Sequence, residues 1–452
     1  MESFDIIVIG MGPGGEHVAG TLAERGLRVL GVERQLVGGE CPYWGCIPSK
    51  MMSRAANALA EARRVEGLAG SVGDVVPDWG PVARRIREEA TDDWDDQVAV
   101  DRFVGKGGTF VRGTGRIVAP GQVDVDGTVY AATRGIVVAT GTRPSVPPIE
   151  GLEKVQYWTN HEAVEATELP DSLVVLGGGA IGCELAQVMV RFGVQVTVVE
   201  AAEHLLPLEE PEAGELLRNV LEAEGAVVHT GMSARRVDRD GSGVVVVLGA
   251  GDVVHAERLL VATGRRAEPA AVGLDVVGVP ADARTASVDE WCRVSDGVWA
   301  VGDITGEGAF THVAMYQAGI VIRDVLGEDG ATADYRALPR VTFTDPEVGA
   351  VGLTERQARE RLEEVAVGRA SVPSTARGWI HKVGNEGTIV LVADADRGVL
   401  VGATAMGPAG GEVVGALTVA VHAQVPIETL RSMIYAYPTF HRGIEDALRD
   451  LA

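Results

Sequence analysis

The chain opens on a β-branched run that passes directly into a glycine-rich turn, Ile6-Ile7-Val8-Ile9-Gly10-Met11-Gly12-Pro13-Gly14-Gly15. Residues 17–25 carry Ala and Leu at helical spacing, and residues 27–32 predict a second buried strand that ends at Glu33. Glycines in the pattern G-x-G-x-x-G allow a tight turn and let a pyrophosphate approach a helix N-terminus. The carboxylate after the second strand suits a ribose hydroxyl, so this stretch predicts a dinucleotide-binding Rossmann unit.

The same pattern recurs further along the chain. The run Ser172-Leu173-Val174-Val175-Leu176 leads into Gly177-Gly178-Gly179-Ala180-Ile181-Gly182, and residues 195–199 predict a strand that ends at Glu200. The first glycine and the closing acid are 23 residues apart in both copies. One glycine motif would be weak evidence in a chain with 59 glycines, but two copies in full strand–helix–strand context strongly indicate two dinucleotide sites.

A second pair of similar segments supports this interpretation. Residues 136–141 and residues 259–264 each predict a buried strand that ends in Ala-Thr-Gly. Small residues at such a strand end let the backbone approach a ligand or another chain segment closely. Two dinucleotides on one chain indicate a flavin together with a nicotinamide.

Composition limits the alternatives. The length of 452 residues favours about three domains, and 46% hydrophobic residues suffice for buried cores. The net charge of −24 disfavours nucleic acid or an anionic membrane as a partner. Four cysteines are too few for a disulfide scaffold, no apolar run is long enough to span a bilayer, and the acidic start does not resemble a signal peptide. The cytoplasm is therefore the expected compartment.

A cysteine-containing segment directly follows the first Rossmann unit, Gly38-Gly39-Glu40-Cys41-Pro42-Tyr43-Trp44-Gly45-Cys46-Ile47-Pro48-Ser49-Lys50. A persistent structural disulfide is disfavoured in a reducing compartment, whereas a close pair can cycle between dithiol and disulfide. The segment offers no His and no third Cys, so no metal site is expected. Two buried free thiols remain the plainer alternative.

In this setting the cysteine segment resembles that of the pyridine nucleotide–disulfide oxidoreductases, which include dihydrolipoamide dehydrogenase, glutathione reductase and mercuric reductase. The run Val298-Trp299-Ala300-Val301-Gly302-Asp303 is similar to the second FAD motif of that family, and residues 311–314 follow at the family's spacing. Residues 339–349 are similar to the start of its dimerisation domain. The resemblance covers nearly the whole chain.

The resemblance implies an α/β fold with two Rossmann-like domains, for FAD and for NAD, and a C-terminal α+β dimerisation domain. We expect the FAD domain to comprise residues 1–145 and 266–335. The nucleotide domain inserted into it would span 146–265, and the dimerisation domain 336–452. The expected assembly is a homodimer.

The resemblance also assigns catalytic roles. Cys41 would be the interchange thiol that faces the substrate, and Cys46 the charge-transfer thiol against the flavin. Lys50, one of only four lysines in the chain, would lie near flavin N5 and pair with Glu184. Such a pair would stabilise negative charge on the reduced flavin.

The expected cofactor contacts follow the same motifs. Those for FAD are Gly10, Gly12, Gly15, Glu33, Lys50, Gly115, Thr140, Gly141, Asp303 and Thr311, and those for NAD are Gly177, Gly179, Gly182, Glu200 and Gly264. A carboxylate at position 200 would repel the 2′-phosphate of NADPH. Residues 201–204 (Ala-Ala-Glu-His) add another acid and no Arg. We therefore predict that NADH is preferred over NADPH.

The chain departs from the family near its C-terminus. Disulfide-reducing relatives carry H-P-T-x-x-E there, in which His is the acid–base group that serves the partner subunit. This chain has Tyr437 at the His position and Arg442 at the Glu position. Tyrosine, with an ordinary pKa of about 10, is a poor base at neutral pH. His441 and Glu445, four residues apart, could form a displaced dyad, although an ordinary surface pair is favoured.

Three functions therefore stay open. The leading hypothesis is an FAD enzyme that oxidises NADH and reduces a small disulfide or other thiol-reactive acceptor through Cys41 and Cys46. The second is a reductase that acts on quinones, dyes or metal ions directly from the flavin. The third is a redox-sensing flavoprotein with little turnover, which the intact cysteine pair disfavours.

Overall fold

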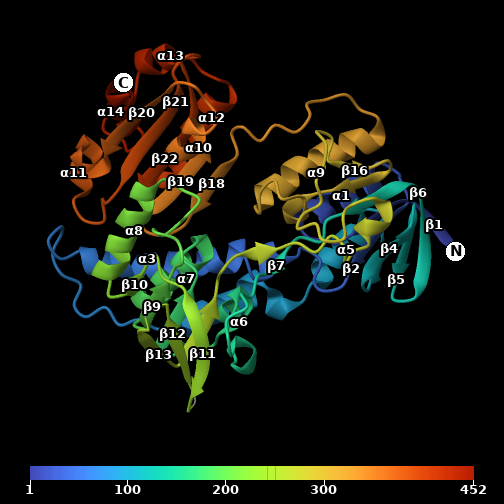
Figure 1. Ribbon diagram of the computed structural model, residues 1–452, viewed down its shortest axis with the longest axis horizontal. Helices are drawn as coiled ribbons and strands as arrows, with labels where there is room; N and C mark the ends of the chain where they lie inside the picture. Colours follow the sequence, from blue (N-terminus) through green and yellow to red (C-terminus); the bar gives the residue numbers. More distant parts are fainter. Residues whose placement is uncertain (242, 250, 452) are drawn as a thin grey trace. The chain divides into compact units, whose positions relative to one another are not determined.

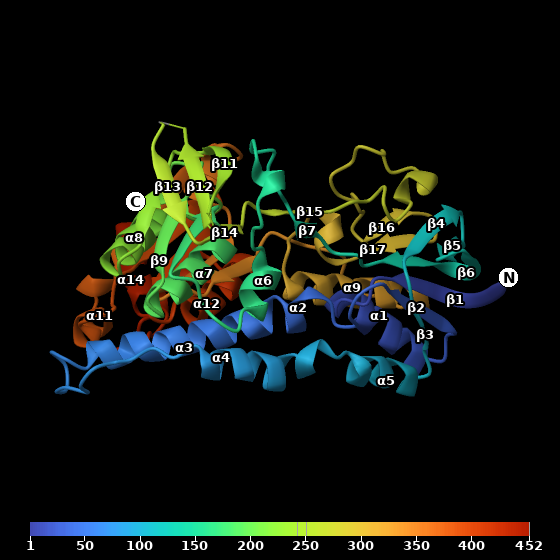
Figure 2. The same ribbon diagram turned by 90° about the horizontal axis from the view of Figure 1, so that it is seen from below.

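The computed structural model describes residues 1–241, 243–249 and 251–451. Contacts divide the chain into two compact units (Figures 1 and 2). Unit 1 comprises Met1–Pro48, Arg85–Ser145 and Arg265–Asp334, and unit 2 comprises Ser49–Arg84, Val146–Gly264 and the chain from Tyr335 onward. The boundaries of the three expected domains remain a prediction. The α/β class is confirmed by the elements that follow.

Unit 1 is built on an eight-stranded sheet whose main path runs β16-β17-β6-β1-β2-β3, with β5 joining β4 to β6. Its strands are β1 (Glu2–Ile9), β2 (Val29–Glu33), β3 (Thr109–Arg112), β4 (Gly115–Ala119), β5 (Gln122–Val125), β6 (Thr128–Val138), β16 (Arg293–Ser295) and β17 (Val298–Ala300). β1 runs parallel to both β2 and β6. A separate two-stranded sheet pairs β7 (Arg143–Pro144) with β15 (Arg265–Arg266).

The apolar run that precedes the first glycine turn forms β1, and its side chains alternate between two cores. Ile6 and Val8 face a core shared with α1 (Pro13–Glu24), α5 (Gln97–Gly105) and α9 (Thr311–Leu326). Ile7 and Ile9 face a second core formed with β4, β5 and β6. A strand buried on both faces explains why its sequence is continuously hydrophobic rather than alternating. Helices α1 and α9 lie side by side (Figure 1).

Unit 2 contains the second Rossmann unit. A parallel sheet runs β10-β9-β8-β14, and a three-stranded antiparallel sheet runs β11-β12-β13. These strands are β8 (Ser172–Leu176), β9 (Gln195–Val199), β10 (Val227–His229), β11 (Ala234–Asp240), β12 (Gly243–Leu248), β13 (Val253–Ala256) and β14 (Arg258–Val261). The associated helices are α3 (Cys46–Arg64), which belongs to this unit from Ser49 onward, α4 (Gly80–Arg85), which belongs to it up to Arg84, α6 (Asn160–Glu165), α7 (Ala180–Arg191) and α8 (Pro211–Ala223). One apolar core joins the two sheets.

The C-terminal part of unit 2 is an antiparallel sheet of order β18-β19-β22-β21-β20. Its strands are β18 (Pro339–Thr342), β19 (Glu347–Gly352), β20 (Val365–Ser371), β21 (Thr388–Asp394) and β22 (Val399–Gly407), and its helices are α10 (Glu355–Arg359), α11 (Ala376–His381), α12 (Gly410–His422), α13 (Ile427–Ser432) and α14 (Gly443–Asp450). α12 packs on β19 and β22, whereas α14 packs on β20 and β21. This is the α+β arrangement expected for the region.

Among the described residues, no helix combines the length and apolar composition needed to cross a bilayer.

Candidate active site

The two glycine-rich loops have nearly the same backbone. Gly10 has φ +92° and Gly177 has φ +108°, in the region that L side chains rarely adopt. A Cβ on Gly15 would lie 2.0 Å from the carbonyl oxygen of Gly10, and a Cβ on Gly182 would lie 1.9 Å from that of Gly177. The first and third glycines of each motif are therefore required by the turn and by its packing.

The middle glycine of each motif, unlike the first and third, has open space beside it. A Cβ on Gly12 or on Gly179 would meet nothing within 4 Å. Both residues lie at the N-cap of a helix, α1 and α7 respectively, and neither cap has a side-chain hydrogen bond. Space beside unpaired helix N–H groups fits the pyrophosphate of a dinucleotide. The loops thus fit two dinucleotides, one in each unit.

The acids that close the two Rossmann units also have matching positions. Glu33 accepts hydrogen bonds from the backbone N–H groups of Met11 (2.8 Å) and Gln35 (2.8 Å). Glu200 accepts from those of Gly178 (2.6 Å) and Ala202 (2.7 Å). Each carboxylate oxygen keeps a further lone pair for a ribose hydroxyl. The loop and the acid therefore form one preorganised site in each copy.

The Ala-Thr-Gly segments lie against these loops. The N–H of Ala139 donates to the carbonyl of Ile9 (2.8 Å), and a Cβ on Gly10 would lie 2.5 Å from the Ala139 carbonyl oxygen. Thr140 is therefore held beside the first glycine turn. Gly115 begins β4, where a Cβ would lie 3.0 Å from a methyl of Ile9.

The two glycines that end these segments have positive φ, +62° at Gly141 and +110° at Gly264. A Cβ on either would meet nothing within 4 Å. The backbone there is open to a close ligand approach, as the sequence predicts.

Asp303 belongs to a polar chain that sequence reasoning missed. Its carboxylate accepts from the Thr142 hydroxyl (2.7 Å), and the Arg265 guanidinium donates to that hydroxyl (2.9 Å) and to the Thr142 carbonyl (2.8 Å). Arg265 also forms an ion pair with Glu40 (3.3 Å), the residue before the first cysteine of the segment. Burial raises the pKa of Asp303. The chain thus links a residue expected to bind the flavin ribityl group to the start of the cysteine segment.

The two segment cysteines lie together in unit 1. Cys41 is partly buried in the short helix α2 (Glu40–Tyr43), and Cys46 is exposed at the first residue of α3. A hydrogen bond with Cys46, together with burial, raises the pKa of the Cys41 thiol well above its usual range. The N-terminus of a 19-residue helix favours negative charge at Cys46.

Thr311, the first residue of α9, lies beside the two cysteines. Its hydroxyl oxygen is 3.4 Å from the Cys46 sulfur. It also interacts with the Cys41 thiol, on which it acts to lower the pKa. Two sulfurs and one hydroxyl thus form a compact set in which a single negative charge can be shared.

Lys50 and Glu184 form an ion pair in unit 2, with 2.7 Å between Nζ and Oε2. The Glu184 side chain is 8% exposed, and its other oxygen accepts from the N–H of Phe343 (2.8 Å). Lys50 Nζ also lies 4.5 Å from the centre of the Phe343 ring. The structure brings together two residues 134 positions apart, and Phe343, which sequence reasoning missed, contacts both.

The C-terminal segment has no His–Glu dyad at the expected positions. Tyr437 is 69% exposed, and the Arg442 guanidinium lies 5.3 Å from the centre of its ring. Glu445 pairs with Arg442 (3.0 Å) and with Arg449 (2.7 Å), while His441 Nε2 lies 3.5 Å from the Thr439 hydroxyl. The displaced dyad is therefore not formed, because His441 and Glu445 have different partners.

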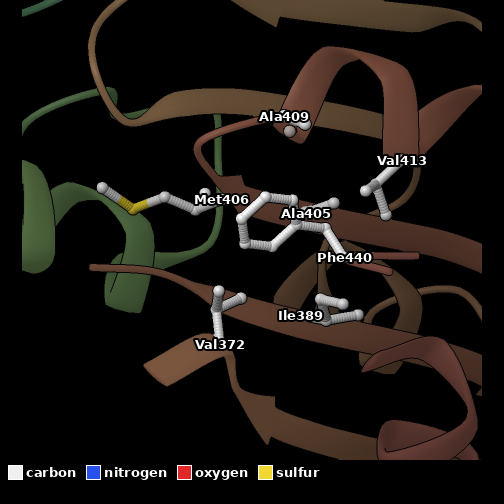
Figure 3. A pocket seen from close by; sticks show the side chains of 9 residues that line it. Val372, Ile389, Ala405, Met406, Ala409, Val413 and Phe440 are labelled. Carbon is white, nitrogen blue, oxygen red and sulfur yellow. The ribbon is translucent and has the colours of Figure 1, made fainter. Parts of the chain in front are cut away.

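Phe440 anchors this segment to the C-terminal core. Its ring points among apolar side chains of β21, β22 and α12 (Figure 3). The cavity beside it has a volume of about 10 Å³ and is lined by Val372, Ile389, Ala405, Met406, Gly407, Ala409, Gly410, Val413 and Phe440. That is about the space of one water molecule, far below the size of a substrate pocket.

Comparison with known proteins agrees with this geometry. Residues 4–318 match the pyridine nucleotide-disulphide oxidoreductase family, and residues 338–448 match the dimerisation domain of that family. The chain belongs to this family. It is accordingly an FAD-dependent oxidoreductase that uses a pyridine nucleotide, and its dimerisation domain supports a homodimer.

The relatives of this oxidoreductase include enzymes of two kinds. It is 34% identical to the dihydrolipoyl dehydrogenase of Chlorobaculum tepidum, with 99% of this chain and 97% of the relative covered. It is 32% identical to the mercuric reductase of Streptomyces lividans, with 98% and 95% covered. These relatives support transfer of electrons from a reduced nicotinamide through FAD to a disulfide.

Solved structures share the fold of this oxidoreductase. The HOCl-induced flavoprotein disulfide reductase RclA from Escherichia coli, as a Cu(II) complex, superposes with a TM-score of 0.86 at 24% identity, with 99% of each chain covered. LpdA from Mycobacterium tuberculosis superposes with a TM-score of 0.85, also at 24% identity and 99% coverage of each chain. At this identity the likeness bears on the fold alone.

Proposed function

We propose that this oxidoreductase takes electrons from NADH and delivers them through the Cys41–Cys46 pair to a small disulfide or another thiol-reactive acceptor. When FAD is bound, the flavin would supply two-electron transfer from the nicotinamide to the cysteine pair, and the Cys41–Cys46 S–S bond would break to leave a thiol on Cys41 and a thiolate on Cys46. Exchange with an acceptor disulfide would then restore the Cys41–Cys46 bond and release two acceptor thiols, which take the proton of Cys41 and one proton from solvent. The proposed compartment is the cytoplasm, where free thiols stay reduced.

The arrangement of Cys41, Cys46 and Thr311 is the observation that carries this proposal. Cys46 lies at a helix N-terminus, 3.4 Å from the Thr311 hydroxyl, and both features favour a thiolate over a thiol. Cys41 hydrogen-bonds to Cys46 and has a raised pKa, so it would retain its proton while Cys46 carries the charge. Two buried free thiols without a redox role would give no reason for both to contact the Thr311 hydroxyl.

Substrate-side chemistry must proceed without the usual acid–base histidine. Cys41 attacks an acceptor disulfide only as a thiolate, so its proton must leave first. Tyr437 is exposed and backed by the Arg442 guanidinium, which suits hydrogen-bond donation better than proton abstraction. We therefore propose Tyr437 as a donor to the acceptor rather than as a base.

The proposed cofactor preference rests on Glu200. Its carboxylate is fixed by two backbone N–H groups at the end of β9, where an adenine ribose is expected. A phosphate on that ribose would meet a fixed negative charge and no guanidinium in residues 201–204. NADH carries a hydroxyl there, which can donate to the carboxylate.

A second candidate function is reduction of quinones or dyes directly from the flavin. The specific observation in its favour is the replacement of the dyad by Tyr437 and Arg442, because transfer from the flavin needs no thiol exchange. A sensor with little turnover fits less well, since it gives no reason for the Lys50–Glu184 pair.

An anaerobic screen separates these functions. NADH-dependent reduction of lipoamide, small disulfides, quinones and Hg(II) is measured beside the Cys46→Ser variant. The proposal expects disulfide reduction by the wild type and its loss in the variant. Quinone reduction that is equal in both proteins, with no disulfide reduction in either, would favour the second function instead.

A further inference from the structure

A polar ladder in unit 2, buried on α7 and partly buried on α3, connects the Lys50–Glu184 pair to residues far from it. On α3, Lys50, Asn57 and Arg64 are spaced seven residues apart, so they lie along one face with about 10 Å between one residue and the next. On α7, Glu184, Gln187 and Arg191 are spaced by three and four residues and also share a face. Each of these six side chains contacts the other helix or the segment 343–345.

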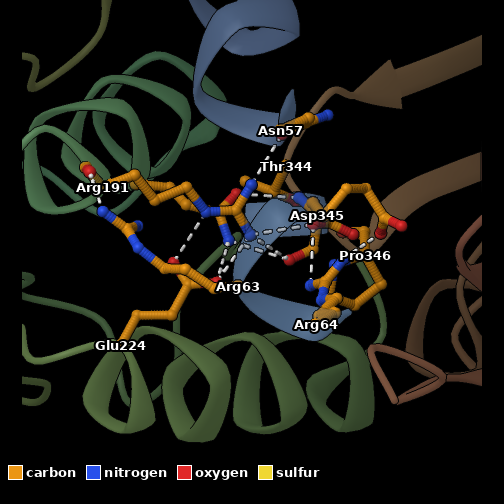
Figure 4. Close-up of polar contacts among 10 residues, drawn as sticks. Asn57, Arg63, Arg64, Arg191, Glu224, Thr344, Asp345 and Pro346 are labelled. Carbon is orange, nitrogen blue, oxygen red and sulfur yellow. Dashed lines mark hydrogen bonds and ion pairs between the residues drawn. The ribbon is translucent and has the colours of Figure 1, made fainter. Parts of the chain in front are cut away.

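Arg191 is the most buried member of the ladder, with 2% of its side chain exposed. Its guanidinium donates to the Asn57 side-chain oxygen (2.6 Å) and to both carboxylate oxygens of Glu224 (Figure 4). It also donates to the Asp345 carboxylate at 2.9 Å. Arg191 therefore joins α3, α8 and the loop after β18 in one place.

Asp345 holds the loop between β18 and β19 against both helices. Its carboxylate lies 2.8 Å from the Arg64 guanidinium on α3, in addition to its contact with Arg191 on α7. Its backbone N–H donates to the Gln187 side chain (2.8 Å), and its carbonyl accepts from the same side chain (2.8 Å). Four contacts through three side chains thus fix the position of one loop residue.

Phe343, two residues before Asp345 in the same loop, contacts the Lys50–Glu184 ion pair. The N–H of Phe343 donates to Glu184, and the Phe343 ring lies beneath the Lys50 ammonium. A shift of Asp345 would move Phe343, and with it both the orientation of the Glu184 carboxylate and the surface on which Lys50 rests. The ladder is therefore a continuous path of contacts from Arg191 to Lys50.

We propose that Arg191 is a positioning residue for the Lys50–Glu184 pair, acting through Asp345 and Phe343. This inference rests on the proposed function in one respect, that Lys50 serves the flavin. The assigned role is specific: Arg191 sets how tightly Lys50 is held by Glu184, and it touches neither substrate nor cofactor. A residue that only stabilised the fold would lower stability without changing the environment of Lys50.

Lysine labelling tests the proposal in the holoenzyme without any assay of turnover. Reductive methylation needs the free amine, so an ammonium held by a carboxylate reacts slowly. Lys50, Lys106, Lys154 and Lys382 are the four lysines of the chain, so mass spectrometry can follow each one. Lys154 is 78% exposed and serves as the internal standard.

The variant Arg191→Met removes the charge and the hydrogen bonds while keeping an unbranched side chain. Methylation of Lys50 relative to Lys154 should rise by about threefold or more, as expected for loss of a coupled contact. Arg191→Lys should restore part of the protection. Arg218→Met is the matched control, because Arg218 is 43% exposed on α8 and should leave Lys50 unchanged. If Arg191→Met does not fold, Asp345→Asn makes the same test with a smaller change.

A double-mutant cycle adds a second readout, the two-electron potential of the flavin. Arg191→Met should lower this potential in the wild-type background, and a tenfold change in the equilibrium corresponds to about 30 mV. In a Lys50→Met background the same change should have no further effect. An unchanged potential in Lys50→Met alone would contradict the proposed role of Lys50, while the labelling result would still decide the role of Arg191. Equal Lys50 labelling in Arg191→Met and wild type would overturn the inference.

Discussion

The second glycine loop offers a matched pair of substitutions with opposite expected results. Alanine at position 179 would place a methyl group in open space at the N-cap of α7, where φ is −75° and suits alanine. Alanine at position 182 would place its methyl group 1.9 Å from the Gly177 carbonyl oxygen. The first change should therefore affect the ligand, and the second should affect the fold.

The magnitudes follow from the space at each position. Ordinary contact with a Cβ begins near 3.4 Å, so Gly182→Ala forces its surroundings apart by about 1.5 Å. Overpacking of this kind typically costs about 1–3 kcal/mol of unfolding free energy. Gly179→Ala should change stability by less than about 0.5 kcal/mol. Its methyl group would instead occupy the place proposed for the NADH pyrophosphate, which should raise the KM for NADH by about 10- to 100-fold, or about 1.4–2.8 kcal/mol.

Three measurements on each variant check these values: NADH kinetics, FAD content and the thermal unfolding midpoint. FAD content should match wild type in Gly179→Ala, because the first loop, around Gly12, belongs to unit 1 and is unchanged. A wild-type KM for NADH in Gly179→Ala would refute the placement of the nucleotide. Wild-type stability in Gly182→Ala would refute the packing argument.

Further predictions concern the cysteines, the cofactor preference and the Asp303 chain. The raised pKa keeps the Cys41 thiol protonated at neutral pH. The rate at which a disulfide oxidises the reduced enzyme, measured by stopped flow, should therefore rise as pH increases from 7 to 9. A rate that falls over this range would contradict the assignment of Cys41 as the thiol that attacks the acceptor. The kcat/KM of the wild type with NADH should exceed that with NADPH by about 100-fold, and Glu200→Gln should lower this ratio by about tenfold. A wild-type preference for NADPH would exclude repulsion of the 2′-phosphate by Glu200. Arg265→Met should release the Thr142 contact and weaken FAD retention during gel filtration, whereas Arg266→Met, at the exposed neighbouring residue, should not.

The features that sequence predicts well are those whose determinants lie close together in the chain. The glycine spacing and the closing acid of each Rossmann unit lie within 23 residues of Gly10 or Gly177, and the structure forms both loops with the same turn. The Lys50–Glu184 pair spans 134 residues. This pair could be predicted only because the surrounding motifs resemble those of a known family.

The contacts that sequence reasoning missed join residues that are far apart in the chain, without a local pattern. Arg191 and Asp345 are 154 residues apart, and Thr142 and Asp303 are 161 apart. No periodicity indicates such pairs, because they depend on how separate elements pack. His441 and Glu445 show that spacing alone does not decide a contact, because residues four positions apart could share a helix face. However, α14 begins only at Gly443, and Glu445 pairs with its own i+4 neighbour, Arg449.

The passage of electrons through the cysteine pair is tested most directly by the rate of NADH-dependent disulfide reduction in Cys46→Ser. Anaerobic NADH should still bleach the flavin of this variant, since the nicotinamide and FAD loops are unchanged. Disulfide reduction should fall by at least about 1,000-fold, because no dithiol can form. A variant that reduces the disulfide at the wild-type rate would contradict the proposed path.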